Sequence, residues 1–239
     1  MTMGLLMVVV LRRDHDHAPR SSVFSTTRLA PAPTIGHRSD VTTPDDVLEF
    51  WFPPDSTRAN AMWWGKDPRL DAEIRERFGP TLAAAKAGEL DGWTATARGR
   101  AALIIVLDQL SRNIFRGDPR TYEADAQACA LTLAGVRLGQ DRELDPMQRL
   151  FFYMPLEHSE ELEHQETCVE LMKGLAADVA AEAGVDPARS DRFVGFIDYA
   201  VRHRDIVARF GRFPHRNALL GRESTAEEIE FLKQPGSSF

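Results

Sequence analysis

Hydrophobic residues recur at the three- and four-residue spacing of an α-helix along most of this chain. The helical period suits roughly residues 94–115, 121–138, 163–183 and 188–210. Strictly alternating patterns, which would indicate half-buried strands, are nearly absent, and Val and Ile are sparse outside the helical windows. The pattern predicts an all-α fold, an irregular helical bundle of about 8–10 helices joined by short connections.

Capping residues mark the starts of further helices. Ser224 and Glu227 have the spacing of a capping box, ahead of Ile229 and Leu232, which would share one helical face. Three other helices are predicted to begin at a capping residue followed by proline: Thr43-Pro44, Asp67-Pro68 and Asp145-Pro146.

Two helices are predicted to end at helix-breaking residues. After Asp67-Pro68, hydrophobic residues recur every four positions up to Phe78, and we expect Gly79 to end that helix. Pro155 lies inside the apolar segment 151–162, where we expect it to kink or end the helix. Such a break would leave backbone groups without helical partners beside the polar residues that follow.

One predicted helix changes character along its length. Residues 101–107 are apolar on every face, so the helix should be buried all round. We therefore expect a group of core residues here: Leu103, Ile104, Leu107 and Leu110. The same helix then becomes densely polar, and its charged side chains must either reach the surface or meet partners inside.

Composition narrows the class of protein. The 239 residues suffice for one generous domain, and the formal net charge of −7 argues against a general binder of nucleic acid or of anionic membranes. Two isolated cysteines, Cys129 and Cys168, form no metal or redox motif and are interpreted as small core residues. Free thiols of this kind are typical of a protein in a reducing compartment. These features favour a cytoplasmic protein.

The amino-terminal segment differs from the rest of the chain. Residues 3–11 form a short apolar run with Arg12 and Arg13 after it, whereas a signal peptide carries its positive charges before the run. Residues 1–42 are expected to be a disordered tail, and the cell could begin translation at a later codon. Residues 43–239 are expected to form a single all-α domain.

Several long polar motifs resemble the DUF924 family, a bacterial group of uncharacterised proteins. The motifs are VLEFWF (47–52), LDQLSRNIFRGDPR (107–120), FFYMPLEHSEEL (151–162), RHRDIVARFGRFPHRNALLGRESTAEE (202–228) and the ending GSSF. The resemblance runs from about Val41 to Phe239, and it implies a right-handed superhelix related to tetratricopeptide repeats. It carries over no established activity, and His164 departs from the pattern.

Three polar clusters could converge on one site. The first cluster follows the apolar helix and consists of Asp108, Arg112, Asn113 and Arg116. If these residues do not form a site, they would form an exposed ladder of ion pairs along the helix. The second, Glu157 and His158, follows Pro155 and could either cap the broken helix or perform acid–base chemistry. The third surrounds a helix end expected at Gly211, and its arginines suit a carboxylate or phosphate if they are not simply solvated: His203, Arg209, Arg212, His215, Arg216 and Asn217.

Other kinds of site receive little support from the sequence. Glu161 and His164 have the spacing of one half of a di-iron motif, but no second copy occurs, so no metal is expected. Nucleophile elbows and phosphate-binding glycine loops are missing, so no cofactor is expected either. The early aromatic residues are interpreted as core anchors: Trp51, Phe52, Trp63, Trp64 and Trp93.

The leading hypothesis is a helical binding protein whose polar pocket accepts an anionic small molecule or a peptide carboxylate. The first alternative is a cofactor-independent enzyme that uses Glu157, His158 or His215 as acid and base. The second is a scaffold in which these charges only hold helices together. A perturbed pKa inside a concave pocket would favour the enzyme, and full internal pairing the scaffold. We expect Arg112 or Arg212 to pair with Glu157.

Overall fold

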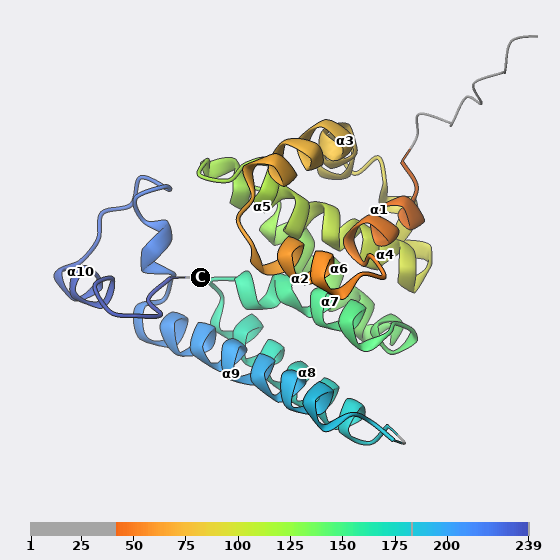
Figure 1. Ribbon diagram of the computed structural model, residues 1–239. Helices are drawn as coiled ribbons and strands as arrows, with labels where there is room; N and C mark the ends of the chain where they lie inside the picture. Colours follow the sequence, from red (N-terminus) through yellow and green to blue (C-terminus); the bar gives the residue numbers. More distant parts are fainter. Residues whose placement is uncertain (1–41, 183, 239) are drawn as a thin grey trace, which may run out of the picture. The chain divides into compact units, whose positions relative to one another are not determined.

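The computed structural model describes residues 42–182 and 184–238, and these are helical with no β-strand among them (Figure 1). The α-helices are α1 Pro44–Trp51, α2 Ser56–Trp64, α3 Pro68–Lys86, α4 Ala97–Ile104, α5 Ser111–Ile114, α6 Asp125–Arg137, α7 Pro146–His158, α8 Leu162–Ala180, α9 Pro187–Phe210 and α10 Ala226–Phe231. Short 3-10 turns lie between them. The predicted all-α class is confirmed. The predicted tail, residues 1–42, lies almost wholly outside the described residues.

The helix starts follow the capping signals. Thr43 and Asp46 form a reciprocal capping box at α1. Asp67 and Asp145 each accept backbone N–H groups at the starts of α3 and α7. These three predicted starts are confirmed, because each short polar side chain satisfies donors that the first helical turn leaves open.

The predicted end of α3 at Gly79 is wrong. The helix continues through Gly79 and Pro80 to Lys86. Leu82 and Ala85 are fully buried and extend the buried face that Ile74 and Phe78 begin. The hydrophobic burial of this last stretch outweighs the single backbone hydrogen bond that Pro80 cannot donate.

The capping box of α10 lies one residue later than predicted. It joins Thr225 and Glu228, while Ser224 accepts a hydrogen bond from Asn217. The side chain of Glu228 is buried and also accepts from Arg212. Tertiary contacts of this carboxylate therefore select the cap. Ile229 is 48% exposed and does not anchor the helix.

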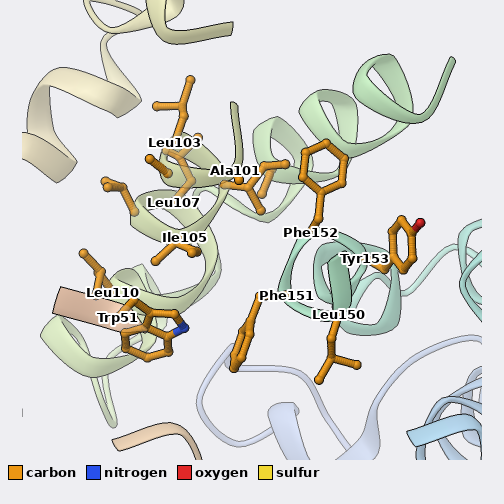
Figure 2. Close-up of a cluster of buried hydrophobic side chains, with 14 of the residues drawn as sticks. Trp51, Ala101, Leu103, Ile105, Leu107, Leu110, Leu150, Phe151, Phe152 and Tyr153 are labelled. Carbon is orange, nitrogen blue, oxygen red and sulfur yellow. The ribbon is translucent and has the colours of Figure 1, made fainter. Parts of the chain in front are cut away.

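The central helix is buried as predicted. The chain passes from α4 through a π-helical segment, Ile105–Leu110, into α5, and every residue of that segment is buried. Figure 2 shows Leu103, Ile105 and Leu107 in this core, with Phe151 and Phe152 of α7 opposite. π-helical turns within α-helices are frequent at functional sites. Here the wide turn carries Asp108 in its interior.

Helices α7, α8 and α9 pack against one another. α8 and α9 are joined by a short loop and run side by side (Figure 1). Pro155 lies inside α7, which ends one turn later at His158, and Gln165 of α8 donates to the freed carbonyl of Glu157. α9 ends at Gly211 in the left-handed conformation, as predicted. No helix among the described residues is long and apolar enough to cross a membrane.

Candidate ligand-binding cleft

Two adjoining cavities, about 470 and 320 Å³ in volume, form a cleft between α2, α5, α7 and α9. Their shared lining is basic: Lys66, Arg112, Arg116, His158 and His203. The larger cavity is mostly apolar, and its walls include Met62, Trp63, Trp64, Met154, Phe196 and Tyr199. The smaller cavity adds Tyr122, His215 and Arg216. The cleft is therefore apolar on one side and cationic on the other.

Asp108 and His158 form a buried pair at the shared wall. The Nδ1 of His158 lies 2.8 and 3.0 Å from the two oxygens of Asp108, which also accept from Gln109. Burial alone would raise the pKa of Asp108, but the positive charge of Arg112 and the hydrogen bond from His158 outweigh it and hold the pKa well below its usual value. An ionised Asp108 can only accept, so Nδ1 of His158 carries the proton and its Nε2 is an acceptor.

His158 is a neutral imidazole at neutral pH. Burial, and then the positive charge of Arg112, lower its pKa despite the opposing effect of Asp108. Its Nε2 has no hydrogen-bond partner among the described residues, and the side chain lines both cavities. The arrangement orients an unprotonated nitrogen in the cleft.

Glu157 presents a buried carboxyl group to the larger cavity. Residue Glu157 is only 5% exposed, and its side chain receives no hydrogen bond from the described residues. Desolvation, and then the negative charge of Asp108, raise its pKa to about 8. The carboxyl group is therefore protonated at neutral pH.

His203 is a titratable neighbour of Glu157. Its Nδ1 lies 3.7 Å from Glu157 Oε1 and donates to the carbonyl of Tyr199 at 2.9 Å. Burial lowers the pKa of His203 to about 3. Both groups are uncharged at neutral pH, so this contact is not an ion pair. His203 is buried, as are Ile206 and Val207 one turn later on the same helix.

The arginines of the cleft are held by carboxylates behind them. Arg112 donates two hydrogen bonds to Asp125, at 2.9 and 3.2 Å, and lies 3.5 Å from Asp108. Arg216 donates to the carbonyl of His158 at 2.8 Å, and its buried Nε has no acceptor among the described residues. These contacts fix both guanidinium groups at the smaller cavity.

Arg116 and Lys66 extend the basic wall. Arg116 donates to both oxygens of Asp71, at 2.6 and 2.9 Å, and Asn113 donates to the same carboxylate at 2.8 Å. Lys66 forms no ion pair with another described residue. Four cationic side chains thus face three carboxylates, and the wall carries a positive surplus when Glu157 is neutral.

The three predicted clusters are brought together only in part. Arg112, Glu157 and His158 line the larger cavity, and His215 and Arg216 line the adjoining one with Arg112 and His158. Glu160 holds the third cluster in place, since it accepts from Arg222 and from the backbone N–H of Phe213. His215 is partly buried, and burial lowers its pKa to about 4.

Four predicted site residues do not line the two cavities. Asp108 is fully buried and binds Nδ1 of His158. Arg209 pairs with Glu227, while Arg212 and Asn217 both bind the carboxylate of Glu228. They brace the carboxyl-terminal turn. The expected pairing of Arg112 or Arg212 with Glu157 is wrong, because each arginine has a closer carboxylate and Glu157 faces the apolar cavity.

The sequence did not lead us to expect Trp63, Trp64 and Lys66 in the lining of the cleft. Trp63 and Trp64 line the cleft, and Trp64 is 48% exposed rather than a core anchor. Adjacent residues on a helix point about 100° apart, so Trp63 and Trp64 cannot both point into the core. The sequence carried this signal as two adjacent tryptophans with Lys66 two residues after them. Among the described residues, no group of three or more His, Cys, Asp or Glu is placed to hold a metal ion.

The chain belongs to the family described as a bacterial protein of unknown function, DUF924, whose model matches residues 47–236. It is similar to the solved structure of a protein of unknown function from Agrobacterium tumefaciens, with 35% identity and a TM-score of 0.68. That likeness covers 80% of this chain and 96% of the other. A comparison with curated proteins gives no match.

Proposed function

We propose that this protein binds a small amphipathic anion, with an acidic group at the basic wall and an apolar body in the larger cavity. The observation that carries the proposal is the shared lining of the two cavities, where Arg112 and Arg116 stand between an aromatic space and a second basic space. One ligand spanning the junction would meet both kinds of wall.

The basic wall suits a carboxylate or phosphate. Arg112 is already oriented by Asp125, so little side-chain entropy is lost when it binds a ligand. Lys66 has no competing carboxylate among the described residues, and the buried Nε of Arg216 lacks an acceptor. These donors are stronger when the acceptor is ionised, which favours an anion over a neutral ligand.

The larger cavity suits an apolar body of aromatic size. Its volume of about 470 Å³ lies in the usual range for small-molecule sites. Trp64 packs against Phe151 and Phe196, with ring centroids 6.0 Å apart in both cases, so the wall is aromatic. A ring entering this space would gain from aromatic contacts as well as from burial.

The scaffold alternative is disfavoured by Glu157. A residue kept only for packing would not place a carboxyl group, 5% exposed as a residue, at the wall of a cavity with no hydrogen-bond donor from the described residues, because burying a polar group is costly. The cost is understandable if a ligand supplies the missing partner.

Binding is tested with matched probes. We expect 3-phenylpropanoate to quench the fluorescence of Trp63 and Trp64 and to bind more tightly than its neutral amide, 3-phenylpropanamide, or than propanoate. Lys66→Gln should weaken the binding of the acid roughly tenfold, in line with the loss of about 1.4 kcal/mol from one charged contact, without lowering the thermal midpoint. Lys173→Gln on the exposed face of α8 is the matched control. Equal affinity for the acid and the amide would refute the proposal.

A further inference from the structure

A proton donor and a proton acceptor that are adjacent in the sequence, Glu157 and His158, both line the larger cavity. Glu157 and His158 are the last residues of α7, one turn after Pro155. Both side chains line the 470 Å³ cavity, and neither Glu157 nor Nε2 of His158 has a hydrogen-bond partner among the described residues. Two open polar groups in one buried site point to a ligand that completes them.

The base is His158. Asp108, fully buried, binds its Nδ1 and so fixes both the tautomer and the orientation of the ring. The free electron pair on Nε2 therefore lies on the cavity side of the ring. Asp108 acts on the ligand only through His158 and is a positioning residue.

The acid is Glu157. Its carboxyl group lies in apolar surroundings beside an ionised Asp108, and it keeps its proton at neutral pH. A carboxylic acid held neutral in this way can donate a hydrogen bond, or a proton, to a carbonyl oxygen. The described residues that line the larger cavity include no serine, threonine or cysteine, so proton transfer is the chemistry its side chains supply most directly.

We propose that Glu157 and His158 catalyse keto–enol proton transfer on a bound aromatic 2-oxo acid. This inference rests on the proposed binding function. With the carboxylate at Arg112 and the ring among Trp63, Trp64 and Phe196, the carbonyl and the neighbouring carbon lie between the two ends. His158 lines both cavities and Glu157 the larger one, so the acid–base pair flanks that middle part.

The step balances within the pair. Nε2 of His158 takes a proton from the carbon next to the carbonyl, and the electron pair of that C–H bond forms the C=C bond of the enol. The carbonyl π pair takes the proton of Glu157 to form the O–H bond. Glu157 becomes a carboxylate and His158 an imidazolium, and the reverse transfer restores both. In D₂O the imidazolium exchanges its Nε2 proton with solvent before the reverse transfer, so repeated cycles replace the carbon-bound protons with deuterons.

Phenylpyruvate is the test compound. The full chain is incubated with it in D₂O, exchange at the carbon next to the carbonyl is followed by proton NMR, and affinity is measured by tryptophan fluorescence. We expect exchange well above the uncatalysed rate. Glu157→Gln and His158→Gln should each lower the exchange rate roughly 10²-fold while affinity changes little. Glu170→Gln, on an exposed part of α8, is the matched control and should exchange like the wild type.

The outcomes separate the two proposals. Binding of phenylpyruvate without accelerated exchange would overturn the catalytic inference and leave the binding function standing. No binding of either phenylpyruvate or 3-phenylpropanoate would overturn the binding function, and this inference with it. If Glu157→Gln lost binding and exchange in proportion, Glu157 would be a binding group and not a catalytic residue.

A variant of the positioning residue gives a second readout. The groups that face Glu157 are Asp108 from the π-helical turn, His203 from α9 and Cys168 from α8, with His158 beside it. Asp108→Asn removes the charge that helps to hold the proton on Glu157, so the alkaline limb of the exchange rate should move to lower pH. A purely structural role for Asp108 would lower the rate and leave the limb in place.

Discussion

The imidazole of His158 donates from Nδ1 to the carboxylate of Asp108, at 2.8 and 3.0 Å, across fifty residues of sequence. This bond joins the polar end of the buried central helix to the carboxyl-terminal end of α7. Arg112, one turn after Asp108, and Arg216, which donates to the carbonyl of His158, then fall at the same junction. The pair therefore defines where the cleft forms.

Replacing Glu157 with glutamine should stabilise the protein at alkaline pH. The folded-state pKa of Glu157, about 8, lies above that of an unfolded glutamate, so folding stability is lost as pH rises from about 4.5 to 8 and the unfolded chain alone ionises. Glutamine does not titrate. The variant should exceed the wild type by on the order of a few kcal/mol at pH 9, with the difference vanishing near pH 4, as measured by urea denaturation. A difference independent of pH would show that the carboxyl is ionised in the folded protein.

Truncating Arg112 should destabilise the fold. Arg112→Ala leaves the buried Asp108 and the partly buried Asp125 without their main counter-ion, and breaking a buried pair costs roughly 3–5 kcal/mol. Arg98→Ala removes an exposed pair with Asp45 and should cost at most about 1 kcal/mol. Chemical denaturation of both variants makes the comparison. Equal small losses would mean that solvent reaches Asp108.

His215 should make the protein sensitive to acid. Burial lowers its folded-state pKa to about 4, below the unfolded value of 6.5, so its contribution is present above pH 6.5 and is lost as pH falls toward 4. His215→Gln should therefore lose about 1–2 kcal/mol less stability than the wild type between pH 7 and pH 5. Thermal midpoints across this range provide the test. Parallel curves for the two proteins would show that His215 is protonated in the folded state.

The buried central helix predicts a large effect at Leu107. The side chain is fully buried in the main core, and Leu107→Ala should cost about 2–5 kcal/mol. Leu138→Ala, at a residue that is 67% exposed, should change stability by less than roughly half a kcal/mol. Denaturation of the two leucine variants compares a core and a surface position directly. A small loss at Leu107 would contradict the central place of this helix.

The sequence by itself determined the helical class, most helix starts and the buried central helix. These features depend on local chemistry: a cap at Thr43 satisfies the backbone N–H of Asp46 three residues away, and an apolar run at 101–107 must be buried wherever it packs. It also named the polar clusters, because dense charge beside helix breaks needs partners.

Only the tertiary structure decided which charges meet and what lies opposite them. Arg112 could have paired with Glu157, but Asp125 of α6 is closer in space, and this frees Glu157 to face the aromatic wall. α3 crosses Pro80 because a distant core buries Leu82 and Ala85. Burial and pairing energies depend on distances between segments far apart in the chain, and those distances are set by packing that no local pattern encodes.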